Sequence, residues 1–142
     1  MVLELYRTRD CITYDNSVKP NRPTLKAVAE TLLTRTRVPL EAAIDTGFSG
    51  YLLLPQDKYA ELSESELLSD YFLTYNTILG PVQLKRSPVI LEISGNRVPS
   101  FVETPVVGAG KTLAGRRILA GLRIALLGPE AEACILDEYP NT

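Results

Sequence analysis

The sequence has 142 residues, of which none is histidine and only two are cysteine. Without histidine, Ser-His-Asp and Cys-His catalytic groups cannot form within the chain, and neither can zinc sites with histidine ligands. Cys11 and Cys134 lie near opposite ends of the chain. We therefore expect free thiols there rather than a disulfide or a metal-binding pair. We expect no cofactor and no metal, and any side-chain chemistry is left to carboxylates.

An excess of positive charge is absent as well. Fifteen Lys and Arg residues are balanced by seventeen Asp and Glu residues, which gives a net charge of −2. Nucleic-acid binding typically needs basic side chains gathered on one face, so we expect no nucleic-acid partner. No apolar run reaches the roughly 18 residues that span a bilayer. Charges interrupt residues 1–10, unlike a secretion signal. We expect a cytoplasmic protein with no membrane partner.

Short apolar runs separated by turn residues make up most of the chain. The length suits one domain over residues 1–142, with residues 1–22 as an N-terminal extension to which we assign no structure. Strand-like runs occupy residues 25–33, 38–44, 51–54, 71–77, 82–85, 88–94, 97–102, 123–127 and 133–136. Many short strands at close spacing predict an all-β barrel or sandwich.

Helical spacing is confined to two short segments, residues 56–68 and 112–122. Two residue pairs have the composition of hairpin turns, Gly80-Pro81 and Gly95-Asn96. The predicted architecture is therefore mainly β, with two hairpins and one or two short helices.

One loop carries the most informative residues. A predicted strand runs directly into Asp45, Thr46 and Gly47, and Phe48-Ser49-Gly50 follows. An aspartate at a strand end can be a simple turn former. In this loop, however, small residues and backbone N–H groups can hold the carboxylate while a second acidic group comes close. The pattern therefore indicates a catalytic carboxylate at Asp45.

Residues 43–49, Ala-Ile-Asp-Thr-Gly-Phe-Ser, resemble the catalytic motif of the retropepsin-like aspartic peptidases at every position. The resemblance covers residues 23–124 and implies a closed barrel with a flap hairpin at residues 74–83. It also implies an apolar-Gly motif and helix at residues 113–119. Ala114 is smaller than the residue usual there, and Leu126-Leu127-Gly128 fits the same motif.

Peptide hydrolysis of this kind needs two carboxylates that share one proton, one to activate a water and one to protonate the scissile carbonyl. The chain has no second Asp-Thr-Gly or Asp-Ser-Gly. The resemblance therefore implies a homodimer in which each subunit supplies Asp45. Thr46 would form a hydrogen bond across the twofold axis, and Gly47 would allow close approach. The terminal residues 3–6 and 133–136 would form an intersubunit sheet or serve as ordinary edge strands.

The same resemblance places the substrate, a peptide or an unfolded protein, between the catalytic loop and the flap. Ser49 would contact it from the loop side. Ile78, Leu79 and Gly80 would close over it from the flap and exclude water.

Three alternatives remain open. The domain could be a catalytically inactive retropepsin-like dimer that binds peptides without cutting them. Asp45 could be a structural turn in an unrelated β protein. Residues 108–112, Gly-Ala-Gly-Lys-Thr, end like a phosphate-binding loop. That motif needs its first glycine where this chain has Pro105, which lacks an N–H group.

Overall fold

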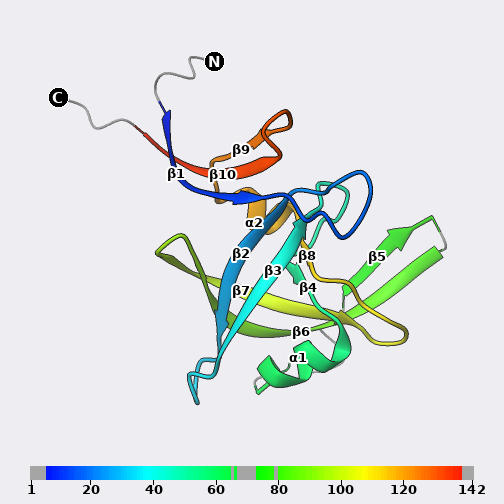
Figure 1. The fold of residues 1–142 in the computed structure, drawn as a ribbon. Helices are drawn as coiled ribbons and strands as arrows, with labels where there is room; N and C mark the ends of the chain where they lie inside the picture. Colours follow the sequence, from blue (N-terminus) through cyan, green and yellow to red (C-terminus); the bar gives the residue numbers. More distant parts are fainter. Residues whose placement is uncertain (1–5, 65, 67–72, 79, 139–142) are drawn as a thin grey trace.

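The computed structural model describes residues 6–64, 66, 73–78 and 80–138, and its fold is mainly β, as predicted (Figure 1). Within these residues the strands are β1 (Tyr6–Thr13), β2 (Thr24–Glu30), β3 (Arg37–Ile44), β4 (Leu52–Leu53), β5 (Leu73–Thr77), β6 (Gly80–Ile93), β7 (Asn96–Pro105), β8 (Leu113–Ala114), β9 (Ile124–Leu127) and β10 (Glu132–Glu138). The helices are α1 (Gln56–Leu62) and α2 (Arg116–Leu119). No helix in the described part of the chain is long and apolar enough to cross a membrane.

Seven strands form one curved sheet in the order β2-β3-β8-β4-β7-β6-β5. Strand β2 also pairs with β6, so the sheet bends back on itself. Strands β4 and β8, which complete this ring, are only two residues long each. The remaining strands form a separate sheet in the order β1-β10-β9. The predicted closed barrel is therefore only approximated.

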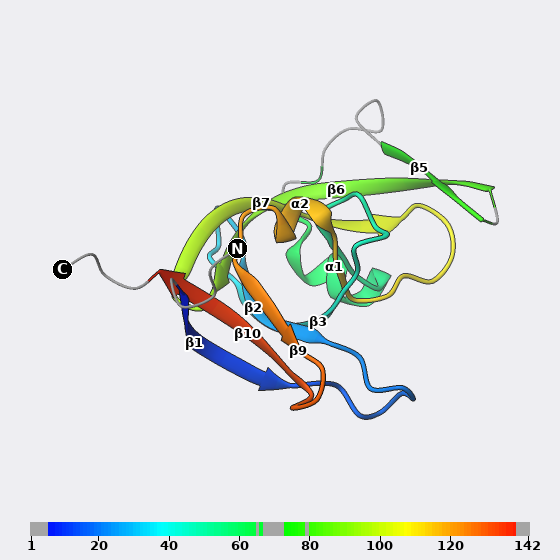
Figure 2. The same cartoon turned by 90° about the horizontal axis from the view of Figure 1, so that it is seen from above.

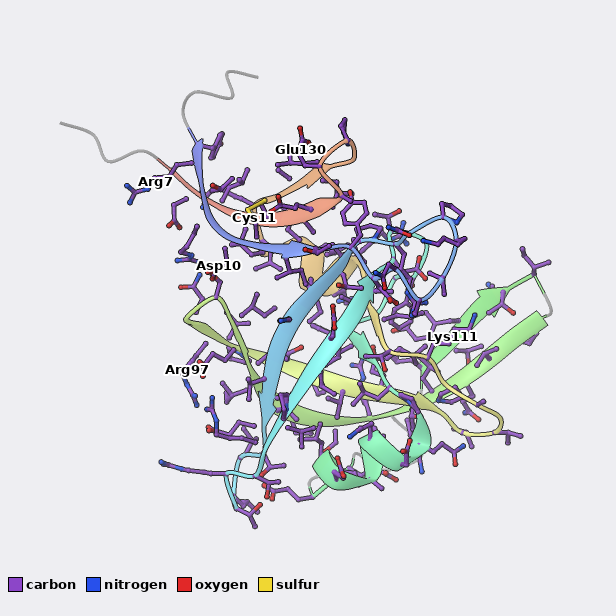
Figure 3. The ribbon with its side chains drawn as sticks, viewed as in Figure 1. Arg7, Asp10, Cys11, Arg97, Lys111 and Glu130 are labelled. Carbon is purple, nitrogen blue, oxygen red and sulfur yellow. A yellow bond between two sulfur atoms is a disulfide. The ribbon has the colours of Figure 1, made fainter. Side chains whose placement is uncertain are left out.

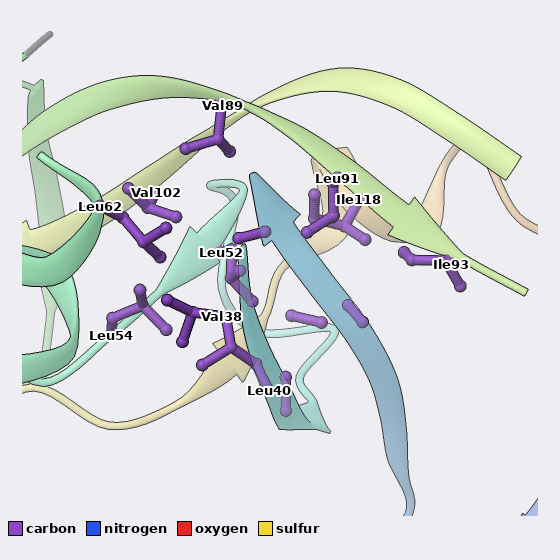
Figure 4. Close-up of a cluster of buried hydrophobic side chains, with 14 of the residues drawn as sticks. Val38, Leu40, Leu52, Leu54, Leu62, Val89, Leu91, Ile93, Val102 and Ile118 are labelled. Carbon is purple, nitrogen blue, oxygen red and sulfur yellow. The ribbon is translucent and has the colours of Figure 1, made fainter. Parts of the chain in front are cut away.

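The core lies inside the curved sheet (Figure 4). Residues alternate between core and solvent along β3, where Val38 and Leu40 are buried, and along β6, where Val89 and Leu91 are buried. This period of two is what a strand with one covered face requires. Helix α1 covers one opening and buries Leu62 among these side chains. Truncating one of these leucines to alanine should cost about 2–5 kcal/mol of stability.

Strands β5 and β6 form the predicted flap hairpin, which projects from the rest of the molecule (Figures 1 and 2). Its turn falls earlier than expected, because Thr77 pairs with Gly80 and Gly80 opens β6. Gly80 has a φ of 113°, a conformation that glycine adopts without strain. Pro81 lies inside the strand, and β7 begins to pair with β6 only at Leu84. A proline is tolerated there because its missing N–H would face an open edge.

The two predicted hairpins share one long strand. Residues 82–85 and 88–94 were expected as separate strands, but both belong to β6, which pairs first with β5 and then with β7. In the second hairpin Ile93 pairs with Asn96, so the turn residues are Ser94 and Gly95, one position before the predicted pair. Both have positive φ, as a tight two-residue hairpin turn requires.

Three segments are shorter than predicted. Strand β2 ends at Glu30, which leaves Leu32 and Leu33 exposed. Helix α1 ends at Leu62: residues 63, 64 and 66 of the predicted helix are not helical, and residues 65, 67 and 68 lie outside the described residues. Residues 112–122 contain only the four-residue α2, because Leu113–Ala114 pairs with β3 and β4 as β8. Backbone pairing with distant strands thus overrides the local helical spacing.

The two cysteines form a disulfide, contrary to the expectation of free thiols (Figure 3). Strands β1 and β10 are antiparallel neighbours, and Cys11 faces Cys134 in their register. A separation of 123 residues along the chain does not matter once both ends of the domain lie in the same sheet. Figure 2 shows β1, β10 and β9 side by side.

The pairing in this sheet shows that the prediction of an intersubunit strand at residues 133–136 was wrong. Residues 133–136 lie in β10, which pairs with β1 on one side and with β9 on the other side, all in one chain. They therefore have no free edge for a second subunit. Tyr6 pairs with Glu138, and residues 3–5 lie outside the described part.

Candidate active site

The Asp45 loop is fixed by backbone hydrogen bonds to the segment that precedes and begins α2. The N–H of Asp45 donates to the carbonyl of Ala114 at 3.0 Å, and the N–H of Arg116 donates to the carbonyl of Phe48 at 2.8 Å. A β-carbon at Gly115 would overlap with the carbonyl oxygen of Gly50 and with the ring of Phe48. Of the Ala114-Gly115 pair in the predicted motif, the second residue therefore occupies a position where only glycine fits.

The carboxylate of Asp45 is half-buried and is oriented by its own loop. Its Oδ1 accepts a hydrogen bond from the N–H of Gly47 at 2.8 Å. Asp45, Gly47 and Ser49 line one wall of a cleft of about 860 Å³, and Ile78 of the flap lines another. The structure therefore brings together four of the predicted site residues.

The other three predicted residues lie elsewhere or are not described. Thr46 is exposed beside the cleft and is not among its lining residues. Gly80 is also outside the lining, at the start of β6. Leu79 lies outside the described residues.

Several residues that line the cleft were not predicted as site residues, although Tyr75 and Leu113 lie in segments that the resemblance had singled out. The lining is mostly apolar and includes Leu53, Tyr75 and Leu113. Lys111 is the one basic residue among those that line the cleft, and Figure 3 shows it near the projecting hairpin. These four residues come from three separate segments, so no single motif could have identified them. A mainly apolar lining with a few polar groups is usual for a ligand-binding cleft.

A buried ion pair lies behind the loop and was not predicted. The side chain of Glu103 on β7 is fully buried, and Arg86 of β6 contacts its Oε2 at 2.9 Å. Tyr75 of the flap donates its hydroxyl to the same oxygen. Burial, and then the charge of Glu103, raises the pKa of Tyr75, which further favours the protonated hydroxyl that donates to Glu103.

One group in the described residues has the spacing of metal ligands. Atoms of Cys11, Glu132 and Cys134 that could bind a metal lie within 4.8 Å of one another. The metal-binding form of cysteine is the thiolate, which the disulfide removes. The oxidised chain therefore does not offer a three-ligand site there.

The fold is similar to that of EIAV protease in a solved structure of its complex with the inhibitor HBY-793. The two chains are 21% identical, with a TM-score of 0.53, over 78% of this chain and 93% of the other. No model of a known protein family matches the sequence, and no curated protein matches it. The likeness shows that this chain has a retropepsin-like fold.

Proposed function

We propose that the protein is an aspartic endopeptidase that acts as a homodimer. The observation that carries this proposal is the placement of Asp45: its carboxylate lies in an apolar cleft, opposite a flap hairpin, in a retropepsin-like fold. A module that only gripped peptides would have no need of this carboxylate. Among the residues that line the cleft, Asp45 is the one acidic side chain, so a second carboxylate has to come from another molecule.

In the proposed mechanism the Asp45 carboxylates of two subunits share one proton. The ionised carboxylate takes a proton from a water molecule, and that water attacks the scissile carbonyl carbon. The protonated carboxylate donates its proton to the carbonyl oxygen. Two carboxyls so close together cannot both ionise, so the pair titrates as a unit. The flap would cover the bound peptide and exclude bulk water.

The outer edge of β9 is the best-placed surface for the second subunit. Strand β9 ends the terminal sheet, and its Leu126 and Leu127 are 50% and 36% exposed. Ile44, which precedes Asp45, lines a small cavity together with Ile124 of β9. Pairing of β9 with its copy around a twofold axis would therefore bring both Asp45 loops near that axis. It would also cover an exposed apolar edge, which is otherwise prone to aggregation.

Peptide cleavage by wild type and by Asp45→Asn tests the proposal. Both proteins are incubated with a mixture of unfolded peptides from about pH 3 to pH 8, and the fragments are read by mass spectrometry. Asp57→Asn, at an exposed aspartate of α1, is the matched control. Cleavage that Asp45→Asn loses and Asp57→Asn keeps supports the peptidase. If all three proteins stay folded and dimeric and none cuts, the non-catalytic peptide-binding dimer replaces it.

A further inference from the structure

The buried carboxylate of Glu103 accepts hydrogen bonds from both the end of the Asp45 loop and the flap hairpin. Its Oε1 accepts the backbone N–H of Tyr51, at the end of the Asp45 loop, at 2.7 Å. Its Oε2 accepts the hydroxyl of Tyr75, on the flap strand β5, at 3.3 Å. Arg86, on the other flap strand, β6, pairs with Oε2 at 2.9 Å. One fully buried side chain thus connects the catalytic loop to both strands of the flap hairpin.

The surrounding residues keep this connection rigid. A β-carbon at Gly50 would lie 2.5 Å from Oε1 of Glu103, so the carboxylate reaches the loop only because residue 50 is glycine. The guanidinium of Arg86 lies over the ring of Phe101, 4.4 Å from its centroid. Arg86 is therefore held by an aromatic face as well as by Glu103. Burying an ion pair is costly unless further hydrogen bonds satisfy it. The carboxylate of Glu103 receives such bonds from the loop and the flap, whereas Nε of Arg86 is buried without a hydrogen-bond partner among the described residues.

A second contact joins the same two segments on the side of the cleft. The ring of Tyr75 packs against the ring of Phe48, with 5.4 Å between centroids, and both residues line the cleft. A peptide that enters the cleft must therefore touch the residues that link flap and loop. Movement of Tyr75 would change both its ring contact with Phe48 and its hydrogen bond to Glu103.

We propose that Glu103 is a positioning residue that couples the flap to the Asp45 loop. Tyr75 and Arg86 bind its carboxylate from the flap, so a displacement of the flap would shift that carboxylate. The carboxylate also binds the N–H of Tyr51 and thereby holds the loop that carries Asp45. The expected effect of this coupling on catalysis rests on the proposed function. The coupling itself is a property of the fold and can be measured without any substrate.

Amide hydrogen exchange of Tyr75→Phe tests the coupling. This variant removes one hydroxyl and keeps the ring on Phe48. We expect exchange to rise on the order of fivefold, the effect of one lost hydrogen bond, both in residues 73–77 and in loop residues 47–51. Tyr14→Phe, at a tyrosine that follows β1, should change neither segment. A rise confined to residues 73–77, or no rise, would overturn the proposal.

Glu103→Gln tests the charge and has a matched control in Glu30→Gln, which breaks a similar carboxylate–arginine pair at the opposite end of β6 and β7. Glu103→Gln should speed exchange in both segments and lower kcat more than it changes KM, and Glu30→Gln should do neither. If Glu103→Gln does not fold, Tyr75→Phe decides alone. The outcome for the peptidase proposal is independent of this test. If the wild-type protein cuts no peptide, the peptidase proposal is refuted and the hydrogen-exchange result remains valid. If Glu103→Gln and Glu30→Gln have equal effects on exchange, only the coupling proposal is refuted.

Discussion

The N–H of Gly47 points at Oδ1 of Asp45, with 2.8 Å between nitrogen and oxygen. This bond between residues two apart closes the loop on its own carboxylate, as in an Asx turn. The loop is held from outside as well, by the hydrogen bond between Asp45 N–H and the carbonyl of Ala114. The carboxylate is therefore oriented before any partner or substrate binds, and its surroundings can be tested one residue at a time.

Thr46→Ala should weaken the proposed dimer. Thr46 is exposed in the single chain, and by the proposed arrangement its hydroxyl bonds across the axis. Losing that bond should cost about 0.5–1.5 kcal/mol of association free energy. Sedimentation equilibrium of the variant, beside Thr8→Ala on β1, measures the difference. An association constant equal to that of wild type would remove Thr46 from the interface.

Gly115→Ala should destabilise the fold. Its methyl group would collide with the carbonyl of Gly50 and the ring of Phe48, so the Asp45 loop would have to shift. We expect a loss of about 1–3 kcal/mol in the free energy of unfolding, measured in urea. Gly128→Ala is the control, since nothing lies within 4 Å of a β-carbon at that position. Equal stability of the two variants would contradict the tight packing at Gly115.

Reduction of the disulfide should destabilise the terminal sheet and with it the whole chain. The bond joins Cys11 to Cys134 and closes nearly the entire sequence into a loop, and losing such a bond typically costs about 2–5 kcal/mol. Guanidinium unfolding with and without a thiol reductant gives the difference. A double variant, Cys11→Ser with Cys134→Ser, should not respond to the reductant. If the reductant leaves the stability of the wild-type protein unchanged as well, the two thiols are unpaired.

The disulfide also bears on where the protein works. The sequence predicts a cytoplasmic protein, and the cytoplasm keeps most thiols reduced. If that prediction holds, the chain works without this bond and at lower stability. Thiol labelling of protein isolated under acid quenching would show which state is populated.

Stability should fall in acid partly through Glu30. Hydrogen bonds from Arg97 and then from Arg37 hold the pKa of Glu30 below its ordinary value of 4.5. A depressed folded pKa adds stability above pH 4.5, which is lost as the pH falls toward the lower folded value. Glu30→Gln should therefore be less stable than wild type at neutral pH, and the gap should narrow below pH 4.5.

Urea unfolding at neutral pH and at about pH 3 measures this gap. Glu130→Gln, at an exposed glutamate, should match wild type at both values. A gap that stays constant with pH would assign the effect of Glu30→Gln to packing. The result also sets the acid limit within which peptide cleavage can be measured on folded protein.

Local patterns in the sequence were sufficient to single out the Asp45 loop and to predict most secondary-structure elements. The Asp-Thr-Gly order and the glycine before α2 are local features of the sequence, so they can be recognised without knowledge of the tertiary structure. The alternation of Val38 and Leu40 with exposed residues likewise reports a strand with one covered face. The mainly β fold and the position of Asp45 were predictable for that reason.

Only the tertiary structure decided the features that depend on distant partners. Cys11 meets Cys134 because β1 and β10 pair, and no local pattern states which strands pair. Glu103 is buried because Arg86, Tyr75 and the loop surround it, although its sequence position resembles that of any strand glutamate. Strand pairing and burial are set by the free energy of the whole assembled core. Local sequence patterns report the secondary-structure preference of each segment, but they do not report which distant residues will pack against it.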